Sequence, residues 1–421
     1  STAAIGGIEG IRQLDKEGPI TVISKEKYHT YSRPLISYLL SGKTDEERMK
    51  YRPDQFYQEM NCRLLTGKAA EKILPDRKEV LISDGSRIAY DKLLVATGSD
   101  AFRPPIDGLE QVKKQFTFMS LDDAKAIQKA VTPDSKVLVM GAGLIGLKCA
   151  EGIAGKAGRI TVIEMADRIL PSILDEKSSE IVRTHLENHG LQFILNDGVR
   201  SFDSGSARLT GGRKIEFDIL IIAVGVRPNV QLVRESGGKV NRGIVIDEYC
   251  RTTLPDIYAA GDCTESYDIT VEEYRVLALL PNAYQQGECA GINMAGGVKQ
   301  FTKAIPMNAV GFFGLPIITA GSYLGNEYVS NGPVAIPEAA RTSAGQNKQS
   351  TPNTYKKLVT KDGLLKGYIL VGDVARAGIY TALIKEKTPL DTIDFELIKA
   401  KPQLMAFSRA EREKMLGGLV K

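Results

Sequence analysis

A glycine-rich turn between a strand and a helix is the feature that most constrains how this chain can fold. Residues Val137–Met140 form an apolar run typical of a buried strand, and a helical pattern follows from Leu147. Between them stand Gly141, Gly143 and Gly146. In a dinucleotide-binding turn the first glycine permits a tight bend, the second lets the backbone approach a pyrophosphate, and the third lets helix and strand pack closely. The stretch therefore predicts a dinucleotide site, with a helix N-terminus directed at the phosphates.

An acidic residue further along supports this prediction. Glycine spacing alone is weak evidence, because the chain has 41 glycines among its 421 residues. However, a strand predicted at Arg159–Ile163 is followed by Glu164, 23 residues after Gly141, where an acidic side chain accepts hydrogen bonds from the adenine ribose. Glu164 favours NADH over NADPH, because a carboxylate repels a ribose 2′-phosphate, and the nearby Arg168 weakens this preference. The alternative is an ordinary βαβ unit with a glycine-rich turn.

Composition excludes several classes of protein. With 43% apolar and 25% charged residues the chain is typical of a soluble globular protein, and its length allows two or three domains. It has no run of 18 apolar residues and no leader pattern at its start, so a cytoplasmic protein without membrane contact is expected. The net charge of +4 does not indicate nucleic-acid binding. The five cysteines form no CxxC pair and no metal-ligand spacing with the three histidines, so a redox-active disulfide, an iron–sulfur cluster and a zinc site are not expected.

The N-terminal residues contain part of a second unit of this kind. Residues Ile5–Leu14 predict a helix and Pro19–Ser24 a strand, which are the second and third parts of a βαβ unit whose first strand is missing from the sequence as given. Ser1 and Ala4 would then stand at the second and third small positions of a fingerprint. Leu64–Leu74 predicts a further strand.

The order of segments is repeated along the chain. Asp91–Ser99 and Asp218–Pro228 are both predicted strands that lead into small-residue turns. The same order of segments occurs twice: a fingerprint, then the strand that leads to the ribose-binding position, then a strand that ends in small residues. This repetition predicts two dinucleotide-binding domains, one inserted into the other. After the insertion, Pro255–Cys263 returns to the first domain with Gly261–Asp262, an acid suited to hydrogen-bonding sugar hydroxyls. Pro281 then opens a helix whose dipole can face an electron-rich ring.

With these motifs in place, the chain resembles the FAD- and NAD-dependent pyridine nucleotide oxidoreductases over nearly its whole length. Its nearest likeness is to NADH:rubredoxin and ferredoxin reductases and to the flavin module of NADH-dependent nitrite reductase. The segments that carry the resemblance are Gly141–Gly146, Glu164–Pro171, Ala96–Gly98, Ala223–Pro228, Tyr258–Asp262, Tyr31–Pro34, Pro281–Ala283, Lys357–Gly363 and Gly367–Asp373.

The resemblance implies an α/β fold with two Rossmann-like dinucleotide-binding domains and a C-terminal α+β interface domain. The expected FAD domain is split into residues 1–115 and 238–298, the inserted NAD domain covers 116–237, and the interface domain, which commonly supports dimerisation, covers 299–421. FAD is implied at Ser1, Ala4, Ser24, Lys25, Arg33, Pro34, Ala70, Ala96, Thr97, Gly98, Gly261, Asp262 and Asn282. NADH is implied at Gly141, Gly143, Leu144, Ile145, Gly146, Glu164 and Gly225.

Some positions depart from the family pattern. Relatives that use a catalytic cysteine have it in the stretch corresponding to Tyr31–Ser37, where this chain has none, which excludes disulfide and peroxide chemistry that depends on that thiol. The acid that usually ends the second strand of the FAD fold is replaced by Ser24, so recognition of the FAD ribose is expected to be weaker or to come from Lys25 or Glu26.

A second departure concerns charge near the flavin. Many ferredoxin reductases have a lysine where this chain has Tyr38, paired with a glutamate where this chain has Lys148. We therefore expect Lys148 to supply a positive charge that stabilises the anionic reduced flavin, with Tyr38 donating a hydrogen bond. The alternative is that Lys148 extends along its helix into solvent.

The resemblance implies an enzyme that transfers a hydride from NADH to FAD and then passes single electrons to a small redox protein or a partner subunit. The cofactors supply this chemistry, so no metal is required. Residues 356–421 hold 13 lysine or arginine residues against 8 aspartate or glutamate residues, an excess that is usually a solvated surface but could dock an acidic partner. The alternatives are an oxidase that reduces oxygen or a small molecule, and a flavoprotein subunit of a larger complex. A homodimer or a subunit of a complex is expected.

Overall fold

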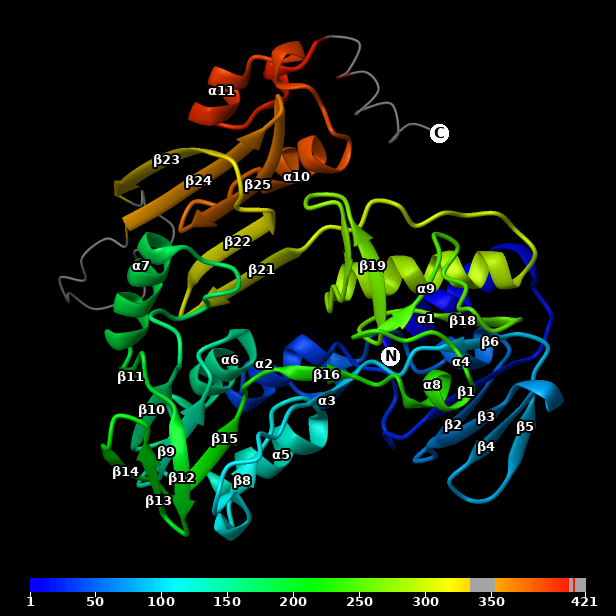
Figure 1. The fold of residues 1–421 in the computed structure, drawn as a ribbon, viewed down its shortest axis with the longest axis horizontal. Coiled ribbons are helices and arrows are strands. Elements are labelled where there is room, and N and C mark those ends of the chain that lie inside the picture. Colours follow the sequence, from blue (N-terminus) through cyan, green and yellow to red (C-terminus); the bar gives the residue numbers. More distant parts are fainter. Residues whose placement is uncertain (334–352, 409–411, 413–421) are drawn as a thin grey trace. The chain divides into compact units, whose positions relative to one another are not determined.

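The computed structural model describes residues 1–333, 353–408 and 412, which fall into two compact units. The first unit contains residues Ser1–Ile163, Asp197–Asp268 and Glu272–Ala304, and the second contains Glu164–Asn196, Ile269–Val271 and the chain from Ile305. Figure 1 shows the elements coloured along the chain. No helix among the described residues is long and apolar enough to cross a membrane. The division into FAD, NAD and interface domains at the boundaries given above stays a prediction.

The first unit contains both helices and strands, in agreement with the predicted α/β fold. Its helices are α1 (Thr2–Leu14), α2 (Ile36–Leu40), α3 (Glu46–Met49), α4 (Phe56–Glu59), α5 (Leu121–Ala130), α6 (Leu144–Ile153), α8 (Gln231–Glu235) and α9 (Leu280–Met294). Its strands are β1 (Ile20–Ser24), β2 (Cys62–Thr66), β3 (Ala70–Leu74), β4 (Glu79–Ile82), β5 (Arg87–Ala89), β6 (Leu93–Val95), β7 (Ser99–Ala101), β8 (Gln115–Phe116), β9 (Lys136–Met140), β10 (Arg159–Ile163), β12 (Val199–Asp203), β13 (Ser206–Leu209), β14 (Lys214–Glu216), β15 (Ile219–Ile222), β16 (Val226–Pro228), β17 (Ile244–Val245), β18 (Ile257–Ala259), β19 (Thr264–Asp268) and β20 (Glu273–Arg275).

A parallel sheet lies around the glycine-rich turn. Strand β9 pairs in parallel with β10 on one side and with β15 on the other, and β15 also pairs in parallel with β8. The apolar residues of β9 and β15 are buried, which is why both read as unbroken hydrophobic runs in the sequence. Helix α6 follows β9 and begins at Leu144, three residues earlier than the periodicity predicted.

Two further pairs of parallel strands involve the N-terminal part of the chain. Strands β1 and β2 form one parallel pair, and β18 and β6 form another. Helix α1 packs closely against α9 because glycines lie at the contact, and a Cβ at Gly6 or Gly10 would overlap the backbone of α9. The expected helix Ile5–Leu14 and strand Pro19–Ser24 are confirmed as α1 and β1.

Three smaller sheets complete the first unit, together with a two-stranded ribbon, and one of these sheets contains β17, β19 and β20. Strands β3, β4 and β5 form one antiparallel meander, and β12, β13 and β14 form another. The single strand predicted over Leu64–Leu74 is wrong, because the chain turns at Gly67, whose φ is +66°, and forms β2 and β3 on either side. Strands β7 and β16 pair with each other in antiparallel orientation.

The second unit is an antiparallel sheet covered by helices. The sheet order is β21 (Met307–Phe312), β22 (Leu315–Gly321), β25 (Leu364–Val371), β24 (Asn353–Lys361) and β23 (Asn326–Pro333). The other elements are β11 (Leu191–Ile194), α7 (Glu176–Glu187), α10 (Ala377–Lys385) and α11 (Phe395–Ala400). Tyr368 of β25 and Tyr380 of α10 are both fully buried, with ring centres 5.5 Å apart, so the core lies between this sheet and α10.

Candidate functional site

Several of the residues predicted to bind FAD lie at one end of two paired strands. Strands β6 and β18 run in parallel and lie side by side in Figure 1, so the segments that follow them leave the sheet at the same edge. These segments are Ala96–Gly98 after β6 and Gly261–Asp262 after β18. The carboxyl edge is where parallel α/β sheets bind ligands.

The starts of α1 and α9 reach the same edge. The Ser1 hydroxyl donates to the carbonyl oxygen of Ala96 at 3.2 Å and also caps α1. A Cβ at Gly261, whose φ is +86°, would lie 3.2 Å from the Cβ of Ala3 and 3.4 Å from that of Ala283. Small residues therefore bring the two helix N-termini and the Gly261 turn together, and their orphan N–H groups favour an anionic ligand.

The first turn of α9 also supplies polar side chains. Asn282 is only 5% exposed. Gln286, one turn further along, accepts a hydrogen bond from the Gly261 N–H at 2.7 Å, and its amide nitrogen donates to the Ser266 hydroxyl at 3.2 Å. Gln286 thus fixes the position of the turn that carries Asp262.

Arg33 is the main cation of this region. Its guanidinium donates to a Glu26 carboxylate oxygen at 2.6 Å and to the carbonyl oxygen of Met119 at 2.5 Å. Burial lowers the pKa of Arg33, but the attraction of Tyr31, Glu26 and Asp262 outweighs it, so the net shift is upward. Burial raises the pKa of Asp262, and the nearby Arg33 offsets only part of this shift. Asp262 is therefore a carboxylate held in an environment that disfavours its charge.

Glu26 and Tyr31 complete the surroundings of Arg33. The Tyr31 hydroxyl donates to Glu26 at 2.6 Å and accepts from the N–H of Leu121 at 2.9 Å, at the start of α5. Burial raises the pKa of Tyr31, so this hydroxyl stays protonated and can serve as the donor. Glu26, a candidate for ribose recognition, is thus held by two protein partners.

The other predicted FAD residues lie around the ends of β1 and β3. Ser24 ends β1 opposite Thr66 of β2, and Lys25, the next residue, pairs with Asp100 at 2.9 Å. Ala70 is the first residue of β3, and Pro34 lies in the 3-10 turn that precedes α2. Lys25 is therefore already engaged by the carboxylate of Asp100.

The glycines of the second turn meet the three demands of a dinucleotide fingerprint. Gly141 has a φ of +97°, which a side chain would strain, and its Cβ would overlap the carbonyl oxygen of Ala223. A Cβ at Gly146 would overlap the carbonyl oxygen of Gly141. A Cβ at Gly143 would meet no atom within 4 Å, and this residue is the N-cap of α6, with no side chain capping the helix. The turn is thus open at Gly143, where a phosphate would approach the N–H groups of Leu144 and Ile145.

The other residues predicted to bind NADH follow later in the chain. Gly225 has a φ of +115° and nothing within 4 Å of a Cβ position. In the second unit, Glu164 accepts a hydrogen bond from the N–H of Ala166 at 3.0 Å. Arg168 contacts the carboxylate of Asp167 at 2.7 Å and the carbonyl oxygen of Leu174 at 3.4 Å. Arg168 is therefore held by its own loop.

Lys148 and Tyr38 lie together at the contact between α6 and α2. The ammonium group of Lys148 forms an ion pair with Glu151 on the next turn of α6. It also lies 5.1 Å from the centre of the Tyr38 ring. The side chains of Lys148 and Glu151 are only 17% and 9% exposed, so Lys148 does not extend into solvent.

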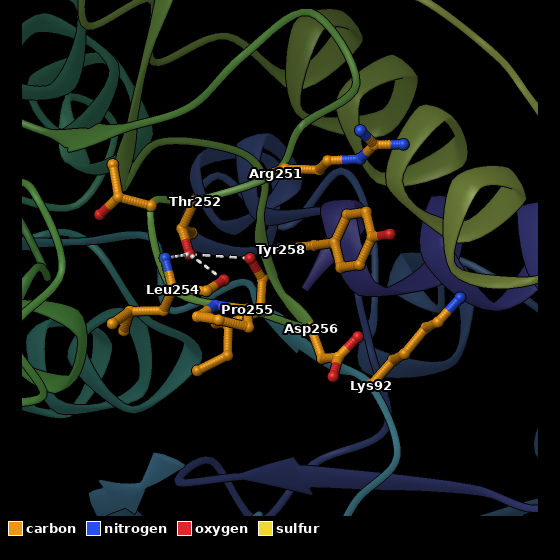
Figure 2. A pocket seen from close by; sticks show the side chains of 9 residues that line it. Lys92, Arg251, Thr252, Leu254, Pro255, Asp256 and Tyr258 are labelled. Carbon is orange, nitrogen blue, oxygen red and sulfur yellow. Dashed lines mark hydrogen bonds between the residues drawn. The ribbon is translucent and has the colours of Figure 1, made fainter. Parts of the chain in front are cut away.

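A pocket lies at the opposite end of β6 and β18. Figure 2 shows this cleft of about 400 Å³, with Lys92, Arg251, Asp256 and Tyr258 among its labelled side chains. Lys92 directly precedes β6 and Asp256 directly precedes β18, so the cleft lies at the amino ends of these strands. None of the predicted cofactor residues lines it.

Sequence reasoning missed two residues that support the site. One is Gln286, described above, and the other is Asn229, which contacts Thr97 and Gly98. Asn229 stands one residue beyond the Ala223–Pro228 motif, so extending the motif by one position would have included it. Nothing in the local pattern around Gln286 distinguishes it from a polar residue on a helix surface.

Comparison with known proteins agrees with this geometry. A model of the pyridine nucleotide-disulphide oxidoreductase family matches residues 2–287. The chain belongs to this family. It is 30% identical over 396 residues to the epsilon subunit of NADH-dependent phenylglyoxylate dehydrogenase from Aromatoleum evansii, covering 93% of this chain and 91% of that protein.

Other known proteins match this chain over a similar share of its length. A rubredoxin-NAD(+) reductase of Alcanivorax borkumensis is 29% identical over 381 residues, covering 89% of this chain and 94% of that protein. The crystal structure of a covalent putidaredoxin reductase–putidaredoxin complex superposes with a TM-score of 0.84 at 21% identity, covering 100% of this chain and 97% of that one. The fold is therefore that of the family, and the chain is an oxidoreductase.

Proposed function

We propose that this chain is an FAD-dependent NADH oxidoreductase that passes electrons to a small acidic carrier protein or to a partner subunit. The observation that carries the proposal is the presence of two turns of dinucleotide type in one unit. The first site is the intact fingerprint turn, Gly141–Gly146. The second is the carboxyl edge of β6 and β18, where the Ala96–Gly98 and Gly261–Asp262 turns meet two helix N-termini.

We assign FAD to the second of these sites, the carboxyl edge of β6 and β18. Once bound, FAD accepts two electrons as a hydride and releases them one at a time. We assign Ser1, Ala4 and the N-terminus of α1, with the Ala96–Gly98 turn, to the pyrophosphate side, and Asp262 to the ribityl hydroxyls. Asn282 and the N-terminus of α9 would face the pyrimidine end of the ring, with Arg33 and Pro34 nearby. Ser24, Lys25 and Ala70 would border the adenosine end.

NADH is assigned to the fingerprint turn. Gly143, Leu144 and Ile145 would bind its pyrophosphate, Gly141 and Gly146 shape the turn, and Gly225 leaves room beside it. Glu164 would accept hydrogen bonds from the adenine ribose. NADH is preferred over NADPH because Arg168 is occupied by Asp167 and Leu174, which leaves Glu164 to repel a 2′-phosphate.

Lys148 and Tyr38 are proposed to tune the flavin. The ammonium group of Lys148 would stabilise negative charge on the reduced ring, and its pairing with Glu151 limits the size of this effect. Tyr38, 40% exposed, would donate a hydrogen bond from the α2 side.

The acceptor is proposed to be a protein. The Tyr31–Ser37 stretch has no cysteine, so a thiol-based transfer to a small disulfide or peroxide cannot start there. The relatives named above are a rubredoxin reductase and a subunit of an NADH-dependent dehydrogenase. The basic excess of residues 356–421 favours an acidic partner, and the C-terminal region is proposed to support a homodimer.

The test is NADH oxidation by the FAD-loaded chain with and without an added carrier. We expect slow oxidation in air, and at least tenfold faster oxidation when a rubredoxin or a [2Fe–2S] ferredoxin is present. Fast oxidation without a carrier, stoichiometric in oxygen, would instead establish the oxidase alternative. Protein that is reduced by NADH but transfers electrons to no free carrier would establish the partner-subunit alternative.

A further inference from the structure

The ribbon of β7 and β16 connects the Ala96–Gly98 turn, the flavin turn, with the Ala223–Gly225 turn, the nucleotide turn, which lies against Gly141 of the fingerprint. Strand β7 begins at Ser99, directly after the Ala96–Gly98 turn, and β16 begins at Val226, directly after Gly225. The strands are antiparallel, with Val226 opposite Ala101 and Pro228 opposite Ser99. Each turn therefore lies at its own end of the same ribbon.

Hydrogen bonds close both ends of this ribbon. At the nucleotide end, the N–H of Phe102 donates to the carbonyl oxygen of Gly225 at 2.9 Å. At the flavin end, the N–H of Asn229 donates to the carbonyl oxygen of Gly98, also at 2.9 Å. The ribbon thus holds the two turns at a fixed separation within one unit.

Asn229 adds a side-chain clasp at the flavin end. Its amide nitrogen donates to the carbonyl oxygen of Thr97 at 3.1 Å, and the Thr97 hydroxyl donates back to the carbonyl oxygen of Asn229 at 2.8 Å. With the backbone bond to Gly98, three hydrogen bonds join Asn229 to two consecutive turn residues. The Ala96 carbonyl oxygen accepts from Ser1, so all three carbonyl oxygens of this turn are engaged. The conformation of the turn, with Gly98 at a φ of +66°, is therefore fixed from the β16 side.

We propose that Asn229 is a positioning residue that sets the alignment of the two cofactor rings by locking the flavin turn to the nucleotide turn. The inference rests on the proposed function, because it assumes FAD at Ala96–Gly98 and NADH beside Gly225. Hydride transfer requires reacting atoms about 3–3.5 Å apart, and a displacement of about 1 Å can cost about 100-fold in rate. A loosened clasp would let the flavin turn shift relative to β16, which changes ring alignment more than the affinity for either cofactor.

The experiment compares Asn229→Ala, Thr97→Val and Thr97→Ser with the unmodified protein. Asn229→Ala removes the amide donor, Thr97→Val removes the hydroxyl donor, and Thr97→Ser retains it. The matched control is Gln231→Ala, which removes an exposed amide two residues along the chain that contacts Arg234. Three quantities are measured: the limiting rate of flavin reduction by NADH in a stopped-flow instrument, the affinity of apoprotein for FAD, and hydrogen exchange of apoprotein peptides spanning residues 97–102 and 225–230.

We expect Asn229→Ala and Thr97→Val to slow the limiting rate about tenfold or more, with the affinity for FAD and the half-saturating NADH concentration changed less than about threefold. Exchange of both peptides should accelerate in these two variants, and Gln231→Ala should behave as the unmodified protein. Thr97→Ser, which keeps the hydroxyl donor, should lose less of the limiting rate than Thr97→Val. A limiting rate within twofold of the unmodified value would overturn the proposal, whatever the exchange shows. A slowed rate without faster exchange would also overturn it, because the effect would not come from the clasp. Failure of the proposed function shows separately, as an unmodified protein that binds no FAD or is not reduced by NADH.

Discussion

The ammonium group of Lys148 lies 5.1 Å from the centre of the Tyr38 ring, so a cation on α6 stacks against an aromatic residue on α2. Lys148 is also paired with Glu151, and both side chains are largely buried. This lysine therefore lies in a largely buried environment, opposite a carboxylate one helical turn away. Removal of the lysine and removal of the glutamate should therefore shift the flavin midpoint potential in opposite directions.

Lys148→Met should make the flavin midpoint potential more negative, and Glu151→Gln should make it more positive. The lysine stabilises the extra negative charge of the reduced ring, and the glutamate opposes it. A shift of about 10–30 mV in each direction corresponds to about 0.5–1.4 kcal/mol for a two-electron couple. Redox titration against a reference dye measures both values. Potentials that agree within 5 mV among the unmodified protein and the two variants would show that neither residue affects the flavin potential.

Glu164→Ser should shift the cofactor preference toward NADPH. Removal of the carboxylate removes its hydrogen bonds to the ribose and its repulsion of a 2′-phosphate, which together are worth about 1.4–2.8 kcal/mol. The ratio of kcat/KM for NADH to that for NADPH should therefore fall about 10- to 100-fold. Glu180→Ser, at an exposed position of α7, is the control and should leave the ratio unchanged. An unaltered ratio in Glu164→Ser would remove this residue from the nucleotide site.

Asp262→Asn should stabilise the apoprotein and weaken its binding of FAD. Burial raises the pKa of Asp262 in the folded state, so the unmodified protein loses stability as the pH rises above the ordinary aspartate range. The variant escapes this loss, and its melting temperature should be higher at pH 7 but equal to that of the unmodified protein near pH 3. The affinity for FAD should fall about 10- to 100-fold, because a hydrogen bond to a charged group contributes about 1.5–3 kcal/mol. A lower melting temperature of the apoprotein at pH 7 would contradict the assignment.

Lys357→Met should destabilise the second unit. The side chain of Lys357 is 8% exposed, and its ammonium group contacts Glu327 at 2.6 Å and Asp175, the N-cap of α7, at 3.2 Å. Its removal leaves two carboxylates without their cation, at a cost of about 1–3 kcal/mol in the free energy of unfolding. Lys177→Met, which removes an exposed partner of Glu180, should cost less than about 0.5 kcal/mol. Denaturant titration distinguishes the two.

The same network gives a pH dependence. Burial alone would raise the pKa of Asp175, but hydrogen bonds from Ser178, Tyr355 and Lys357 outweigh it and lower the pKa. A carboxyl with a lowered pKa stabilises the fold above the unfolded pKa and loses this effect as the pH falls through the folded value. The stability difference between Lys357→Met and the unmodified protein should therefore be constant near neutrality and shrink below about pH 4. A difference that persists unchanged at pH 2.5 would rule out this ionic contribution.

The sequence predicted the fingerprint turn well because its requirements are local. The bend at Gly141, the close contact at Gly146 and the opening at Gly143 each follow from the absence of a side chain at one position. The strand β9 and the acid after β10 were equally visible, since a buried parallel strand is apolar throughout.

Contacts between distant segments were not visible in the sequence. The clasp of Asn229 on Thr97 joins positions 132 residues apart, and no periodicity reports such a pairing. The break in the predicted strand at Gly67 was missed because the flanking residues continue a strand-like composition. Glu26 was considered for ribose recognition, but its engagement by Arg33 and Tyr31 depends on how the following loop folds back.

The absorbance spectrum of the purified chain under anaerobic titration with NADH tests the account most directly. We expect a flavin spectrum with about one FAD per chain, either as isolated or after reconstitution, and complete bleaching of its 450 nm band by about one equivalent of NADH. A chain that binds no FAD on reconstitution, or whose flavin is not bleached by NADH, would contradict the central claim.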